Sequence, residues 1–231
     1  MSNAAYQTVL LDLDHTLFDT EASERIAFEQ TVLAAGVPRA MEHFSTYQRI
    51  NLDLWSAMER GELHPRMIRN LRFERFVAEC DLDANPERMA DDFVAGLGAY
   101  GDLYDGARDV LEQLCAKTSL ALVTNGLSEV QRSRIARLEL DDYFDAVAIS
   151  AEIGMGKPDV GIFDFVFESL GSPKRETAVM VGDNLSADIA GGANYGIATC
   201  WYNPRGYAAE TEHRIDHEVS DLQQLLRLAA R

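Results

Sequence analysis

A short apolar run that ends in or beside a polar residue recurs three times along the chain. These runs cover residues 8–13, 119–124 and 177–183. An apolar run of this length without alternation is typical of a strand buried on both faces of a parallel sheet. Weaker runs at 146–149 and 197–201 complete a set of five predicted strands.

Helical patterns separate the runs from about residue 100 onward. They cover residues 107–117, 128–138, 160–170 and 186–195, and a terminal helix is expected at 220–230. Because strand and helix alternate, the sequence predicts an α/β fold with a doubly wound, Rossmann-like parallel sheet.

The stretch between residues 20 and 98 breaks this alternation. It contains amphipathic segments at 21–35, 42–59, 65–79 and 86–97, and Gly and Pro separate them. A helical block inserted after the first strand would cover the carboxyl ends of the strands, where ligands bind in such sheets. We therefore expect an α/β core domain over residues 1–19 and 99–231, and an all-helical cap domain over residues 20–98.

The charge of the chain limits its partners. Its 231 residues include 38 acidic and 21 basic side chains, which gives a formal net charge of −17. Such a chain repels phosphate backbones and anionic membranes, so we expect neither nucleic acid nor a membrane as a partner. An anionic small molecule would need a local cation. Three cysteines without a CxxC pair, and no signal-peptide pattern, predict a cytoplasmic protein.

Acidic side chains gather at the predicted strand ends. Asp12 and Asp14 lie at the end of the first strand, and Asp183 ends the strand at 177–183, with Asp188 one helical turn later. Carboxylates that share a site repel one another unless a cation lies among them. Oxygen ligands suit a hard divalent ion, and Mg²⁺ fits a site with carboxylates, water and a phosphate. Lys157 could hold a phosphate oxygen and compensate the nearby acids.

Taken together, these residues resemble the haloacid dehalogenase-like hydrolases, the HAD superfamily. The four motifs of that family match Asp12-Leu13-Asp14-His15-Thr16, Thr124-Asn125-Gly126, Lys157-Pro158, and Gly182-Asp183-Asn184 with Asp188. The helical block between the first two motifs resembles the helical cap of the family. The resemblance implies a Mg²⁺-dependent phosphomonoesterase that acts on a small phosphoester.

The resemblance also implies a role for each motif residue. Asp12 would be the nucleophile that forms an aspartyl-phosphate, and Asp14 would be the general acid and base. Thr124, the backbone N–H of Asn125, and Lys157 would bind the phosphoryl oxygens. The ligands of Mg²⁺ would be the Asp12 carboxylate, the backbone carbonyl of Asp14, and Asp183, with Asp188 binding directly or supporting another ligand.

Two segments resemble a bacterial branch of the family that dephosphorylates nucleoside monophosphates, the pyrimidine 5′-nucleotidases. They are residues 51–55 and 200–203. Trp55 could stack on a base and Asn51 could hydrogen-bond one, although Trp in an amphipathic helix more often packs in a core.

Several alternatives stay open. They are a sugar-phosphate or phosphoglycolate phosphatase, a mutase, and a non-enzymatic phospho-accepting sensor module. Asp14 argues against a dehalogenase, because the family's dehalogenases replace this second acid. Four arginines recur at helical spacing, and we expect them to form a solvated face: Arg66, Arg69, Arg72 and Arg75.

Overall fold

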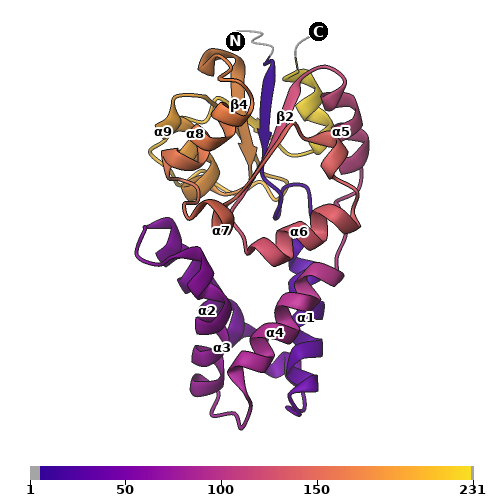
Figure 1. Cartoon of the computed structure of the whole chain (residues 1–231), viewed down its shortest axis with the longest axis vertical. Coiled ribbons are helices and arrows are strands. Elements are labelled where there is room, and N and C mark those ends of the chain that lie inside the picture. The colour runs from indigo at the N-terminus through magenta and orange to yellow at the C-terminus, as the bar shows by residue number, and fades with distance from the viewer. Residues whose placement is uncertain (1–5, 230–231) are drawn as a thin grey trace.

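The computed structural model describes residues 6–229, and these residues form a six-stranded sheet in the order β3-β2-β1-β4-β5-β6 (Figure 1). All neighbouring strands are parallel. At the centre, Leu11 pairs with Leu122 on one side and Val181 on the other. The predicted doubly wound parallel sheet is therefore confirmed. The strands are β1 (Thr8–Leu11), β2 (Ser119–Thr124), β3 (Ala146–Ile149), β4 (Ala178–Gly182), β5 (Ala198–Tyr202) and β6 (His217–Val219).

Successive residues of β1 face opposite layers of helices. Val9 and Leu11 belong to an apolar cluster with α5 (Ala107–Cys115), whereas Leu10 packs with α8 (Val160–Ser169) and α9 (Ala190–Tyr195). Because both faces of the sheet are covered, all four residues of β1 are buried. This explains why the strands have continuous apolar runs instead of an alternating pattern.

The inserted block contains four α-helices, which lie beyond the carboxyl ends of the strands (Figure 1). Their side chains form an apolar core that also includes Leu127 and Val130 from the segment after β2. Tyr47 lies in the middle of this core, and its ring centroid is 4.7 Å from Phe28, 6.1 Å from Phe73 and 5.3 Å from Phe93. The helices are α1 (Thr20–Ala34), α2 (Phe44–Glu59), α3 (Ile68–Glu79) and α4 (Pro86–Ala99).

The division into two domains stays a prediction, although α1 begins at Thr20 and α4 ends at Ala99, next to the expected boundaries. Residues 1–5 and 230–231, which the predicted core domain includes, lie outside the described residues. Within residues 6–229, no helix has the length and apolar character needed to cross a bilayer.

Two details near the end of the chain differ from the prediction. β6 is a sixth strand where five were expected, because three residues are too few to give a strand pattern. A 3₁₀-helix over Leu222–Arg227 replaces the long terminal helix expected at 220–230, of which residue 230 is not described. Its buried residues, Leu222 and Leu225, are three apart, which is the spacing that one face of a 3₁₀-helix requires.

Candidate active site

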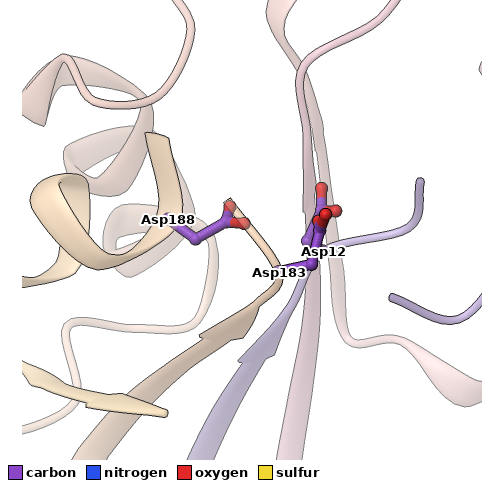
Figure 2. A group of neighbouring side chains, drawn as sticks. All are labelled: Asp12, Asp183 and Asp188. Atoms are coloured by element: carbon purple, nitrogen blue, oxygen red, sulfur yellow. The ribbon is translucent and has the colours of Figure 1, made fainter. Parts of the chain in front are cut away.

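Three carboxylates meet at the carboxyl ends of the two central strands. Asp12 directly follows β1, Asp183 directly follows β4, and Asp188 points toward both from a π-helical turn over Leu185–Ile189 (Figure 2). One oxygen from each carboxylate lies within 4.8 Å of the others. The strand order reverses between β1 and β4. Ligands of open α/β sheets bind at such a reversal, so this cluster is the first candidate for a site.

Asp188 reaches the cluster because residue 182 is a glycine. A Cβ atom at position 182 would lie 2.1 Å from Oδ2 of Asp188, far inside van der Waals contact. The same Oδ2 accepts a hydrogen bond from the backbone N–H of Asn184 at 3.0 Å. The glycine and the turn after β4 therefore fix the position of this third carboxylate.

Lys157 supplies the positive charge in the cluster and is only 2% exposed. Its Nζ lies 2.5 Å from Oδ1 of Asp12 and 2.7 Å from Oδ1 of Asp188. Burial disfavours the ammonium ion, but these two carboxylates outweigh burial and raise the pKa of Lys157 above its usual value. The side chain of Asn125 hydrogen-bonds the backbone N–H and C=O of Lys157, both at 2.8 Å. Lys157 is thus held in place by Asn125, and its two carboxylate partners favour its charged form.

The acids of the cluster carry more charge than Lys157 balances. Burial raises the pKa of Asp12 well above its usual value, and Lys157 opposes this while Asp188 adds to it. Burial and Asp188 together raise the pKa of Asp183 to about 6. A second cation would relieve this repulsion. Since all the donors are carboxylate oxygens, the residues present fit Mg²⁺.

Asp14 makes a different set of contacts. Its Oδ1 accepts hydrogen bonds from Thr20 Oγ1 and Arg134 Nη1, both at 2.6 Å, and its Oδ2 accepts one from Gln131 Nε2 at 2.5 Å. Burial alone would raise the pKa of Asp14, but Arg134 and the hydrogen bonds from Thr20 and Gln131 lower it below the usual value. These contacts therefore favour the ionised carboxylate and hold it in one orientation.

Thr124 is fully buried at the end of β2. Its hydroxyl accepts a hydrogen bond from Gln131 Nε2 at 2.7 Å. Among the described residues that line the cavity beside the cluster are Asn125 and Lys157, but not Thr124. Contact between Thr124 and a phosphate therefore stays a prediction.

A cavity of about 520 Å³ separates the carboxylate cluster from the inserted helices. Its wall on the side of the inserted helices includes Asn51 and Trp55 of α2, together with Glu24 and Arg72. Asn51 Nδ2 donates a hydrogen bond to Glu24 Oε1 at 2.6 Å. Both residues predicted to contact the substrate thus line the same cavity as Asp12.

The expected solvated arginine face is wrong for Arg72. This residue is 3% exposed, and its guanidinium carbon lies 5.0 Å from the ring centroid of Phe93. Stacking on an aromatic ring is a way in which a buried guanidinium is stabilised. Arg66 and Arg75 are exposed and Arg69 is half-buried. Helical spacing alone could not separate Arg72 from these three, because the difference depends on what packs against α3.

Sequence reasoning missed two polar residues of α6 (Ser128–Arg137), Gln131 and Arg134. They are 1% and 2% exposed. A signal for them exists, since they alternate with Val130 and Ile135 on the buried side of this helix. Polar side chains within an apolar helix face need buried partners, and here the partner of both is Asp14.

Comparisons with known proteins agree with this geometry. The model of the haloacid dehalogenase-like hydrolases matches residues 6–196. Pyrimidine 5′-nucleotidase PynA of Streptococcus pneumoniae is 32% identical and covers 96% of this chain and 94% of its own. Pyrimidine 5′-nucleotidase YjjG of Escherichia coli is 32% identical, with coverage of 93% and 96%.

A solved structure agrees as well. The HAD-hydrolase YfnB of Bacillus subtilis, crystallised with magnesium, superimposes with a TM-score of 0.87 at 31% identity, and the match covers 96% of this chain and 97% of YfnB. The family model spans most of the sequence, and the strand-end acids lie within the residues that it matches. The chain therefore belongs to the haloacid dehalogenase-like hydrolases.

Proposed function

We propose that this hydrolase is a Mg²⁺-dependent phosphomonoesterase that releases phosphate from nucleoside 5′-monophosphates. The observation that carries the proposal is the cluster of Asp12, Asp183 and Asp188 beside the buried Lys157, which lines a cavity of about 520 Å³. An ammonium ion among acids can bind a phosphate that the acidic surface would repel. The names of the PynA and YjjG relatives support a nucleotide as the substrate.

In this proposal Asp12 is the nucleophile. Its carboxylate attacks phosphorus while the ester P–O bond breaks, and the product is an aspartyl-phosphate. Asp14 donates a proton to the leaving alkoxide, and it then removes a proton from the water that hydrolyses the aspartyl-phosphate. The negative charge of a bound phosphate opposes ionisation of Asp14, and so favours the protonated form that the first step needs.

Other residues bind and orient the reacting groups. Lys157, the backbone N–H of Asn125 and the hydroxyl of Thr124 would hold the phosphoryl oxygens. Mg²⁺ would be held by Asp12, Asp183 and the backbone carbonyl of Asp14, with Asp188 as a direct or supporting ligand. When bound, the ion neutralises charge on the phosphate oxygens.

The wall opposite the acids is suited to a base. Trp55 presents an aromatic ring to the cavity, and Asn51 presents an amide that is already oriented by Glu24. We assign stacking on the base to Trp55 and hydrogen bonding to Asn51. This assignment favours nucleotides over the phosphoglycolate and sugar phosphates that the sequence also allowed.

Phosphate release from a panel of substrates tests the proposal. With Mg²⁺, we expect kcat/KM to be highest for nucleoside 5′-monophosphates, lower for ribose 5-phosphate and lowest for phosphoglycolate. Asp12→Asn removes the nucleophile and should lower turnover by at least about 10³-fold. Asp142→Asn, which changes an exposed acid on the sheet domain, is the matched control and should keep the wild-type rate.

Two results would contradict this function. A higher kcat/KM for sugar phosphates would overturn the assignment of Asn51 and Trp55 and leave the phosphatase chemistry intact. A long-lived aspartyl-phosphate after treatment with acetyl phosphate, with no turnover of any substrate, would instead identify a phospho-accepting sensor.

A further inference from the structure

Arg134 of α6 connects Asp14 to both ends of the inserted helical block. Its Nη1 donates to Asp14 Oδ1 at 2.6 Å, and its Nε donates to the backbone carbonyl of Leu97 in α4 at 3.0 Å. Its Nη2 donates to the hydroxyl of Ser23 in α1 at 3.4 Å. One side chain therefore joins the acid of the site to the first and last helices of the block.

The surroundings of Arg134 keep its guanidinium in a single orientation. The side chain is 2% exposed, and its guanidinium carbon lies 4.2 Å from the ring centroid of Phe18. A planar guanidinium stacked on a ring offers its donors in fixed directions, which a lysine ammonium cannot do. Burying such a charge is costly unless it is fully paired, and Asp14 is its ion-pair partner.

We propose that Arg134 is the positioning residue for Asp14, and that it sets the direction in which this acid faces the leaving group. This inference rests on the proposed phosphatase function and goes beyond it. Arg134 itself does not touch the substrate in this assignment. It acts through the carboxylate of Asp14, whose other oxygen is held by Gln131.

The neighbouring Arg137 provides a matched control. Its Nε donates to the backbone carbonyl of Gly98 at 3.2 Å, and its Nη2 donates to that of Gly101 at 2.7 Å. Arg137 therefore binds the same connection between α4 and the sheet domain as Arg134 does. Within residues 6–229 it forms no hydrogen bond or ion pair with Asp14, so a variant at 137 separates the contact with the end of α4 from the contact with the acid.

The leaving group reveals whether Asp14 is correctly placed. A nucleoside alkoxide needs a proton as it departs, whereas p-nitrophenolate departs readily without one. The parameter kcat/KM reports the steps up to the formation of the aspartyl-phosphate, and thus includes the departure of the leaving group. Misplacing Asp14 should therefore lower kcat/KM for a nucleotide much more than for an aryl phosphate.

The experiment compares uridine 5′-monophosphate with p-nitrophenyl phosphate in the full-length protein with Mg²⁺. For Arg134→Ala we expect kcat/KM to fall about 10- to 100-fold for the nucleotide, and by less than about threefold for the aryl phosphate. Arg134→Lys keeps the charge without the planar fork. Its kcat/KM should again fall more for the nucleotide than for the aryl phosphate, but by a smaller factor. Arg137→Ala should change the two substrates by the same factor.

Circular dichroism of each variant tests whether the fold is kept. Arg134→Lys allows the comparison even if Arg134→Ala does not fold. If kcat/KM falls by the same factor for both substrates in both Arg134 variants, the inference is overturned. It is also overturned if kcat/KM of Arg137→Ala falls more for the nucleotide than for the aryl phosphate. The rates of the wild-type protein test the proposed function, whereas the ratio between the two substrates tests Arg134. The two proposals can therefore fail separately.

Discussion

Single atoms decide the arrangement of the acids at the strand ends, and position 182 is the clearest case. A methyl group at this position would overlap the carboxylate of Asp188, whose Oδ2 and Cγ would lie 2.1 Å and 2.2 Å from it. The Asp188 side chain would have to move, and Lys157 would then lose its ion pair with Asp188. The absence of a side chain here is thus part of the site.

We predict that Gly182→Ala destabilises the fold by about 1–3 kcal/mol, because extra volume in a packed region forces neighbours to shift. It should also weaken the stabilisation that Mg²⁺ gives. Urea unfolding with EDTA and with Mg²⁺ measures both effects. Gly192→Ala is the control, because its new methyl group would press against Met180 and Thr199, which are not part of the acid cluster. It should lower stability without changing the effect of Mg²⁺. A response to Mg²⁺ in Gly182→Ala equal to that of the wild type would contradict this prediction.

Ion pairs join neighbouring helices, and the strength of one of them depends on pH. Arg132 of α6 forms a two-pronged ion pair with Glu152 of α7 (Ser150–Ile153), with N–O distances of 2.9 Å and 2.7 Å. This hydrogen bonding lowers the pKa of Glu152, against a smaller opposing effect of burial. Since the folded protein holds the ionised form more tightly, the pair stabilises the fold at neutral pH. That contribution is lost as the pH falls through the lowered pKa.

We expect the coupling energy of this pair to be about 0.5 kcal/mol at neutral pH, because both side chains are partly exposed and solvent screens them. A double-mutant cycle with Arg132→Ala and Glu152→Ala, measured by urea unfolding, gives this energy. It should shrink toward zero below the usual Glu pKa of 4.5. A coupling energy that stays constant across this range would show that the charge of Glu152 does not stabilise the contact.

Local pattern explains which elements could be predicted. The central strands and the four inserted helices have apolar residues at the period of their own structure, and these elements lie where we expected them. β6 has three residues and, within residues 6–229, it pairs with β5 alone, so its formation depends on the sheet already present. The 3₁₀-helix at Leu222–Arg227 likewise follows from packing, and helix propensity could not indicate it.

The site divides in the same way. Asp12 and Asp183 could be found because the ends of parallel strands meet at one edge of a sheet. Lys157 could be found because clustered acids and an anionic ligand both need a nearby cation. Gln131 and Arg134 could not be assigned, because their partner is 117 and 120 residues away in the sequence. Only the packing of α6 against the turn after β1 brings them to Asp14.

The whole molecule reconciles an acidic surface with a site for an anion. The formal net charge is −17, yet Lys157, Arg72 and Arg134 are all buried around one cavity. Low exposure strengthens their local field, while the surface charge is screened by salt. The inserted block also contacts the sheet side of the cavity at a point far from Thr20 and Ala99, where the block begins and ends in the sequence. There Glu59 accepts hydrogen bonds from Asn184 at 3.0 Å and from Ser186 at 2.7 Å. These contacts join side chains that are 125 and 127 residues apart in the sequence, so no local sequence pattern could predict them.

We propose that the strand-end acids hold a dication close to Lys157. Calorimetric titration of MgCl₂ into the substrate-free protein tests this claim without relying on turnover. We predict saturable binding of about one ion per chain, and at least about tenfold weaker binding in Asp183→Asn, which removes one of the ligand charges. Binding of equal strength in both proteins, or no binding to the wild type, would show that the strand-end acids do not hold a dication.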